Sequence, residues 1–385
     1  MRRISFIIFF TVALTVYGLI NFYVMLRGWE LLSFHPSVRV WALIAAVILA
    51  ASFILGRILE RIRLTWFSTM LVWLGSFWLA GMTYFLIIAL GIDLLRLSNY
   101  VVPWFPSFVT GDSVNARNWL GIIVAIVVLL TVVLGHFNAI RPRIRTLNLA
   151  VDKTVPEAAS LSIVAVSDIH LGTIIGKTRL RKIVAIINSL NPDLVLFPGD
   201  VFDEDIGPVI KDNLGETLRT VQSKFGVFAI TGNHEYIGGE KAACQYLSDH
   251  GITVLRDASV RIDDVCTVVG REDISARQFG GANRKPLEEL MKDVDHRLPV
   301  ILMDHQPFHL EEAERNGVDL QLSGHTHHGQ LWPFNYVSQR IFEVSWGYKL
   351  KGKSHIYVSC GVGTWGPPVR TGNSPEIVHI KLSFN

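Results

Sequence analysis

The chain has 385 residues, half of them hydrophobic, and a formal net charge of +3. At roughly 150 residues per domain, this length predicts two or three units. Its lysines and arginines do not form a basic stripe with interleaved aromatic residues, so nucleic acid is not an expected partner, and its three cysteines lack the spacing of a disulfide framework.

Four apolar stretches occupy the first third of the chain, at 4–25, 38–55, 66–90 and 119–140. A helix needs about 20 apolar residues to cross a hydrocarbon core of roughly 30 Å. The first stretch follows Arg2 and Arg3, as a signal peptide would, but its apolar run is too long and no small-residue cleavage site follows it. We therefore expect residues 1–140 to form a helical transmembrane region of about four spans.

The arginines near the span ends are unevenly distributed between the two sides. With the N-terminus inside, the inner flanks hold eight and the outer loops four: Arg2, Arg3, Arg57, Arg61, Arg63, Arg141, Arg143 and Arg145 against Arg27, Arg39, Arg96 and Arg117. Basic residues accumulate on the cytoplasmic side of membrane proteins. The pattern predicts a multi-pass protein of the inner (plasma) membrane whose C-terminal part lies in the cytoplasm.

The pattern changes after the last apolar stretch. Residues 141–158 are basic and then polar, which predicts a juxtamembrane linker, and a separate domain is expected at 159–385. Within it, 179–190 has helical spacing, and short apolar runs predict strands at 161–166, 193–197, 225–230, 299–303, 318–322, 355–359 and 376–382. Alternating strands and helices of this kind predict an α/β or layered α/β/α domain with a largely buried sheet.

Polar side chains follow five of these predicted strands, at the point where each strand ends. They are Asp168 and His170, then Asp200 and Asp203, then Asn233, His234 and Glu235, then His305, and finally His325 and His327. Strand ends are where α/β folds place their ligand sites. Oxygen and imidazole ligands without thiolates suit manganese, iron or zinc, and they are numerous enough here for two ions.

In this order the motifs resemble those of the calcineurin-like metallophosphoesterase family, from 161 to the end of the chain. They read Asp-Ile-His at 168–170, Gly-Asp-Val-Phe-Asp at 199–203, Gly-Asn-His-Glu at 232–235, a lone His305, and Gly-His-Thr-His at 324–327. The continuation to Gln330, and Gly-Thr-Trp-Gly-Pro-Pro at 363–368 with Arg370, resemble the branch that has transmembrane helices before the catalytic domain. The resemblance implies a four-layer α/β/β/α domain.

The resemblance also implies roles for the matched residues. Asp168, His170 and His327 would bind one divalent metal ion, Asn233, His305 and His325 a second, and Asp200 would bridge them. Manganese is the first expectation, with iron or zinc as alternatives. His234 would protonate the leaving group, a task that suits the pKa of histidine.

Four further residues have two readings each. Asp203 supports the metal shell or caps the following helix, and Glu235 orients His234 or is a surface carboxylate at a helix start. Arg340 and Arg370 hold a substrate phosphate or form structural salt bridges. The aromatic segment 331–353 either meets a membrane interface and admits a lipid tail or packs as a flap on its own domain.

The expected function is a membrane-anchored, dinuclear-metal phosphohydrolase that cleaves phosphodiester or pyrophosphate bonds. The bilayer and a phosphoester are its expected partners. The sharper version, implied by the resemblance and the anchor, is a lipid-linked nucleotide such as UDP-2,3-diacylglucosamine in lipid A synthesis. The alternatives are a broad-specificity phosphodiesterase or phosphomonoesterase acting on soluble substrates, and a catalytically silent metal-binding scaffold.

Overall fold

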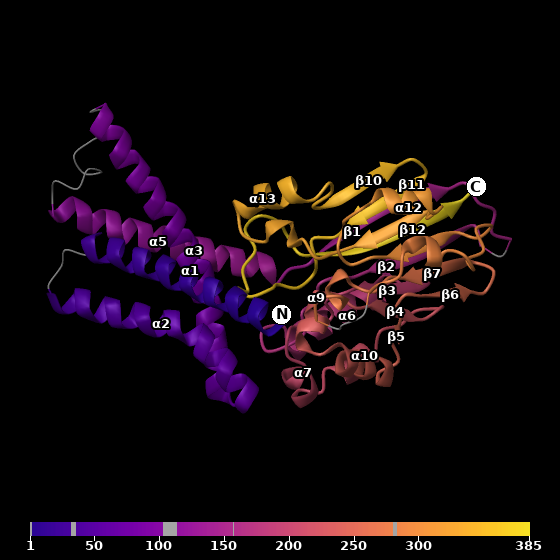
Figure 1. Cartoon of the computed structure of the whole chain (residues 1–385), viewed down its shortest axis with the longest axis horizontal. Helices are drawn as coiled ribbons and strands as arrows, with labels where there is room; N and C mark the ends of the chain where they lie inside the picture. The colour runs from indigo at the N-terminus through magenta and orange to yellow at the C-terminus, as the bar shows by residue number, and fades with distance from the viewer. Residues whose placement is uncertain (1, 32–35, 103–113, 157, 280–282) are drawn as a thin grey trace. The chain divides into compact units, whose positions relative to one another are not determined.

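The structure is a computed structural model that describes residues 2–31, 36–102, 114–156, 158–279 and 283–385. The chain divides into two compact units, Met1–Gly135 and His136–Asn385 (Figure 1). The first contains α1 (Arg2–Leu31), α2 (Pro36–Ile62), α3 (Trp66–Val101) and most of α5 (Val114–Ala139). All four helices are long and apolar enough to cross a membrane, in agreement with the four predicted candidate spans.

Small residues let α2 and α3 approach closely. A Cβ atom added to Gly75 would overlap the backbone of Phe53, and one added to Gly56 would meet the backbone of Val72. Helices in a bilayer gain stability by such close backbone packing, because lipid provides no hydrophobic drive for them to associate. The helix α3 begins at a capping box between Thr65 and Ser68, which satisfies backbone N–H groups at its first turn.

The C-terminal unit contains two six-stranded sheets (Figure 1). The first has the order β1 (Arg143–Val151), β12 (Glu376–Phe384), β2 (Ser160–Ala165), β3 (Leu194–Pro198), β4 (Val227–Ile230) and β5 (Thr253–Val254). The second has the order β10 (Gly347–Lys351), β11 (Ser354–Val358), β9 (Leu320–Ser323), β8 (Val300–Met303), β7 (Cys266–Gly270) and β6 (Ala258–Ile262). Strands β2 to β5 are parallel, as are β7, β8, β9 and β11.

The main core lies between the two sheets. Ile163 and Leu196 of the first sheet share one buried cluster with Val268, Ile301 and Leu322 of the second. A second cluster joins the other face of β7 and β8 to α11 (Leu287–Leu290) and α12 (Glu311–Arg315). The predicted four-layer α/β/β/α domain is thereby confirmed.

The remaining helices are short, apart from α6 (Lys177–Ser189) and α10 (Glu240–Asp249), which bury apolar faces. The short ones are α7 (Gly207–Lys211), α8 (Gly215–Leu218), α9 (Asn233–Gly238), α13 (Phe334–Ile341) and the 3₁₀ turns η1 (Ile274–Ala276) and η2 (His327–Gly329). Two of them, α9 and η2, begin within the candidate metal motifs.

The segment expected to be a linker, 141–158, instead contains β1, which pairs in parallel with β12 from Arg143 opposite Glu376 onward. Only Leu149 and Val151 of this strand are buried. Its sequence lacks the continuous apolar run of a central strand, so the strand was not predicted. Strands β5, β6, β7 and β10 were also not predicted. β5 has two residues, and β6 and β10 are edge strands with alternating exposure.

Candidate dinuclear metal centre

The candidate ligands lie just beyond the carboxyl ends of parallel strands from both sheets. The loops that carry them are bonded to one another through the backbone. Asp168 N–H donates to Gly199 O at 3.1 Å, and His170 N–H donates to Asp200 O at 3.0 Å. The sheet topology therefore places residues separated by more than 150 positions in one site.

Five of the seven candidate ligands have a left-handed backbone conformation. They are Asp168, His170, Asp200, His325 and His327, with φ between 46° and 70°. Residues other than glycine adopt this conformation rarely, and it concentrates at functional sites that the surrounding structure over-determines. The sharp turn at each strand end directs the side chain across the sheet edge.

Two motif glycines are required by close approach. A Cβ atom at Gly232 would overlap Asp200 Oδ1, and one at Gly324 would overlap Asp168 Oδ2. The two carboxylates are further oriented by backbone donors. His234 N–H donates to Asp200 Oδ1 at 2.9 Å, and His325 N–H donates to Asp168 Oδ1 at 2.9 Å. Each carboxylate keeps its second oxygen available to the site.

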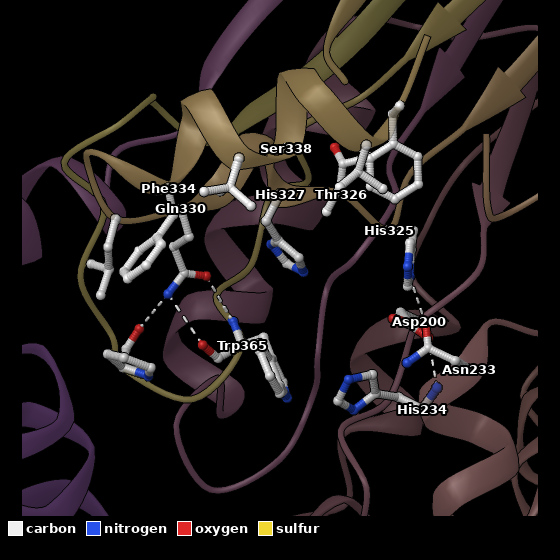
Figure 2. Close-up of a pocket in the computed structure, with 16 residues that line it drawn as sticks. Asp200, Asn233, His234, His325, Thr326, His327, Gln330, Phe334, Ser338 and Trp365 are labelled. Atoms are coloured by element: carbon white, nitrogen blue, oxygen red, sulfur yellow. Dashed lines mark hydrogen bonds between the residues drawn. The ribbon is translucent and has the colours of Figure 1, made fainter. Parts of the chain in front are cut away.

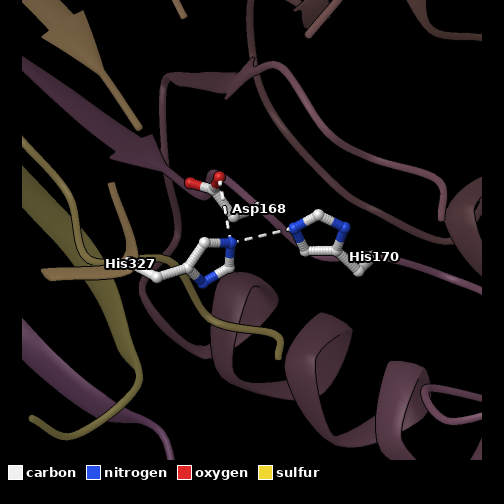
Figure 3. A group of neighbouring side chains, drawn as sticks. All are labelled: Asp168, His170 and His327. Carbon is white, nitrogen blue, oxygen red and sulfur yellow. Dashed lines mark hydrogen bonds and ion pairs between the residues drawn. The ribbon is translucent and has the colours of Figure 1, made fainter. Parts of the chain in front are cut away.

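The first group of candidate ligands is Asp168, His170 and His327 (Figure 3). The Nε2 atoms of the two histidines lie 3.0 Å apart, and His327 Nε2 lies 3.6 Å from Asp168 Oδ1. Burial lowers the pKa of His170 to about 3 and also lowers that of His327, while it raises the pKa of Asp168 to about 6. Both imidazoles are therefore neutral, the form that binds a metal.

The second group is Asp200, His305 and His325, and Asn233 extends it. Asp200 Oδ2 lies 3.2 Å from His305 Nε2, and His325 Nδ1 lies 2.8 Å from Asn233 Oδ1. Asp200 Oδ2 is also 3.8 Å from Nε2 of His170 in the first group. Asp200 thus lies between the two groups, as a bridging carboxylate would.

The residues of both groups suit divalent ions. Asp168 Oδ2 and His170 Nδ1 are buried without a hydrogen-bond partner, a costly arrangement unless another group supplies the interaction. Burial opposes ionisation of Asp200, yet His305 and His234 hold its pKa well below the usual range. A set of carboxylate, amide and imidazole atoms without thiolate matches manganese, iron or zinc.

His234 lies beside the first group and contacts Asp203. His234 Nδ1 is 3.4 Å from Asp203 Oδ1, and its ring centroid is 4.6 Å from that of His170. Burial opposes the charged form of His234, but Asp200 and Asp203 outweigh burial and raise its pKa to about 9. Asp203 therefore orients His234, a contact that was not predicted. It also forms a group of possible ligands with His170 and His234, so its predicted support of the metal shell stays a prediction.

Glu235 stands at the start of α9, as one of its two predicted readings had it, but it is not a surface carboxylate. Its carboxylate is buried, with 2 % exposure, and the hydrogen bonds it accepts come from backbone groups. It accepts hydrogen bonds from the backbone N–H groups of Asp200 at 3.1 Å, Phe202 at 2.9 Å and Gly232 at 2.7 Å. Glu235 consequently ties the loop after β3 to the loop after β4.

A cavity of about 510 Å³ opens beside the candidate ligands (Figure 2). One end is polar, with Asp200, Asn233, His234, His325 and His327, and the other is mostly apolar, lined by Leu331, Phe334, Val337, Ile341, Phe342, Trp365 and Pro367. The apolar residues come from α13, from the residues that flank it and from the loop after β11.

Gln330 fixes the Trp365 side of this cavity (Figure 2). Its Oε1 accepts from Trp365 N–H at 3.0 Å, and its Nε2 donates to the carbonyl oxygens of Trp365 and Pro367 at 3.1 and 2.9 Å. Trp365 lies with its ring centroid 5.9 Å from that of His234. No site role was predicted for Gln330 or Trp365, although both belong to the motifs at 324–330 and 363–368.

Neither arginine proposed to hold a phosphate lines this cavity. Arg340 is exposed on α13. Arg370 is fully buried and donates from Nε and Nη2 to Gly363 O, and from Nη2 to Cys360 O at 2.8 Å. Its Nη1 donates to Asn373 Oδ1. Its Nη2 also lies 3.2 Å from Nδ1 of the candidate ligand His327. Arg370 therefore holds the backbone of the loop after β11 and contacts a candidate metal ligand, in place of the expected phosphate contact or salt bridge.

The fold and the site together define a metal-dependent phosphoesterase domain that follows membrane-spanning helices. Residues 161–329 match the family of calcineurin-like phosphoesterases. The chain is 32 % identical over 250 residues to an uncharacterized metallophosphoesterase of Aquifex aeolicus, covering 64 % of this chain and 94 % of that protein. This chain belongs to the calcineurin-like metallophosphoesterase family.

The chain also resembles animal relatives that combine this domain with a membrane region. It is 32 % identical over 277 residues to a transmembrane protein with metallophosphoesterase domain of Bos taurus, covering 67 % of this chain but only 62 % of that protein. Among solved structures, the 5'-nucleotidase precursor from Thermus thermophilus aligns over 58 % of this chain and 54 % of that chain, with a TM-score of 0.37 at 15 % identity. The predicted branch with N-terminal transmembrane helices is confirmed.

Proposed function

We propose that this protein is a membrane-anchored, dinuclear-metal hydrolase of phosphodiester or pyrophosphate bonds. The observation that supports the proposal best is the position of Asp200, within 4 Å of a histidine from each ligand group and on the wall of the cavity. Asp168, His170 and His327 would hold one ion, and Asn233, His305 and His325 the other. When bound, the two ions supply Lewis acidity and an activated water for in-line displacement at phosphorus.

The protein's own residues would handle the proton of the leaving group. Because Asp203 lies against Nδ1 of His234, the other ring nitrogen, Nε2, is left to donate a proton to the leaving oxygen. The raised pKa keeps this ring protonated near neutral pH. A binding scaffold has no need for such an acid, which favours the enzyme over the silent alternative.

The proposed substrate is amphipathic, such as a lipid-linked nucleotide of the UDP-2,3-diacylglucosamine type. The apolar end of the cavity supports this proposal, because a small soluble phosphoester would leave that wall uncovered. Residues 1–140 would anchor the protein through their apolar stretches. The uneven distribution of arginines supports a catalytic domain on the cytoplasmic side of the plasma membrane.

The test is hydrolysis of bis-p-nitrophenyl phosphate by the full chain in detergent, first stripped of metal and then supplied with manganese, iron or zinc. We expect metal-dependent turnover that is lost in Asp200→Ala and kept in Asp212→Ala, an exposed aspartate at the end of α7. His234→Ala should bind metal normally and lose about 10²- to 10⁴-fold in rate. Bound metal without turnover of any phosphodiester or pyrophosphate would favour the scaffold.

A further inference from the structure

Exposed apolar side chains concentrate at one place in the C-terminal unit. Among its described residues, 15 large apolar side chains are exposed, and nine of them lie within 332–350 or at Trp365. We define the α13 surface as Trp332, Phe334, Tyr336, Val337 and Ile341, whose exposed fractions run from 45 to 59 %. An exposed apolar patch of this kind marks an interaction site more often than chance.

The α13 surface is continuous with the apolar end of the cavity. Phe334, Val337 and Ile341 line the cavity and are also exposed. Their spacing of three and four residues places them along one face of α13. Trp332 and Tyr336 do not line the cavity, so they extend the apolar surface outside it. The apolar face of α13 therefore extends from the molecular surface into the cavity.

The last turn of the apolar helix α5 is bonded to the loop that forms the Trp365 side of the cavity. His136 Nδ1 lies 2.8 Å from Pro368 O, and Asn138 Nδ2 donates to Arg370 O at 3.0 Å and to Asn373 O at 2.7 Å. All these residues belong to the C-terminal unit. A membrane-spanning helix ends near the membrane interface, and these bonds tie the loop after β11 to such a helix end.

The composition of the α13 surface fits a bilayer better than it fits a protein partner. Tryptophan and tyrosine favour the interface between lipid headgroups and hydrocarbon, because their rings are apolar and carry one polar group. Arg340, exposed on the same helix, suits contact with lipid phosphates. The bilayer is present wherever the chain is, since the chain's own helices anchor it.

We infer that the α13 surface lies in the membrane interface and that the metal cavity opens there, so that an amphipathic phosphoester reaches the metal ions from the bilayer with its apolar part still in lipid. The inference that α13 docks on the membrane depends only on its exposed residues and on the contacts of α5. The entry route for the substrate rests on the proposed function.

Docking is tested without any activity measurement. A nitroxide is attached at Tyr336→Cys in the full chain, with Cys244→Ser removing the one half-buried native thiol, in nanodiscs of phosphatidylcholine and phosphatidylglycerol. The control is Ile210→Cys, which is 55 % exposed against 59 % for Tyr336 and lies on α7. We expect relaxation by oxygen to exceed relaxation by an aqueous nickel chelate at 336, and the reverse at 210.

Equal access of the nickel chelate to both labels would refute docking. Exclusion of both oxygen and nickel at 336 would also refute it, because it would show that the surface is covered by another copy of the protein.

The entry route is tested with a pair of substrates that release the same product. Hexadecyl p-nitrophenyl phosphate in vesicles is compared with water-soluble bis-p-nitrophenyl phosphate. For Trp332→Ser combined with Tyr336→Ser, we expect the ratio of the lipid rate to the soluble rate to fall about fivefold or more, and Ile210→Ser to leave it unchanged. A ratio unaffected by the double substitution would refute entry from the bilayer. Failure to hydrolyse either substrate would count against the proposed function, and the nitroxide result would still decide docking.

Discussion

Replacing Glu235 with glutamine tests whether this buried carboxylate holds the Asp200 loop. Oε2 accepts from Asp200 N–H and Gly232 N–H, and Oε1 accepts from Phe202 N–H. Glutamine has the same shape but offers one oxygen. In its better orientation that oxygen keeps two donors, and the amide group faces the N–H of Phe202. A buried N–H without an acceptor costs about 1–3 kcal/mol.

That cost predicts a measurable loss of thermal stability. The C-terminal unit, His136–Asn385, is large enough that each kcal/mol lowers Tm by about 2–4 °C, so Glu235→Gln should unfold about 2–12 °C below the parent protein. Misplacement of Asp200 should also weaken metal binding by about 10- to 100-fold, as is usual when a residue that orients a ligand is changed.

The assay is thermal unfolding of the full chain in detergent, followed by metal titration with detection by mass spectrometry. The matched control is Glu288→Gln, an exposed glutamate on α11. If Glu235→Gln unfolds at the temperature of the control and binds metal within about twofold of it, the carboxylate does not hold the loop and the reasoning fails.

Three further predictions concern the same site. Gln330→Glu keeps the acceptor for Trp365 N–H but places an oxygen against the carbonyl oxygens of Trp365 and Pro367. The cavity wall should therefore shift, and KM for the hexadecyl ester should rise about tenfold, with kcat less affected. An unchanged KM would show that Gln330 does not hold this wall. Arg370→Ala leaves buried carbonyls unsatisfied and should lower Tm by about 5 °C or more in the same unfolding assay, whereas Arg340→Ala should not. Asp203→Asn should lower kcat by about tenfold or more while metal content stays constant, because the orienting charge beside His234 is lost; a fall in metal content would instead make Asp203 part of the metal shell.

The sequence by itself determined the two-part organisation of this protein and the residues that meet at its site. The length of an apolar stretch is a local property of the sequence, so the four candidate spans could be predicted from stretches of about 20 residues. The candidate ligands were also predictable, because each follows a short apolar strand within a compact motif. Within each sheet their convergence follows from the general rule that carboxyl ends of parallel strands share one edge, and the packing of the two sheets brings the two sets together.

Only the tertiary structure decided what the supporting residues contact. Glu235 stands beside His234 in the chain, yet its carboxylate turns to backbone groups 33 and 35 positions away. Arg370 was expected to hold a phosphate or form a salt bridge, and it instead donates to carbonyls of its own loop and contacts His327. β1 carries too few apolar residues to be recognised, and its partner strand β12 lies at the far end of the chain. Such contacts depend on packing between distant segments, which local sequence patterns do not encode.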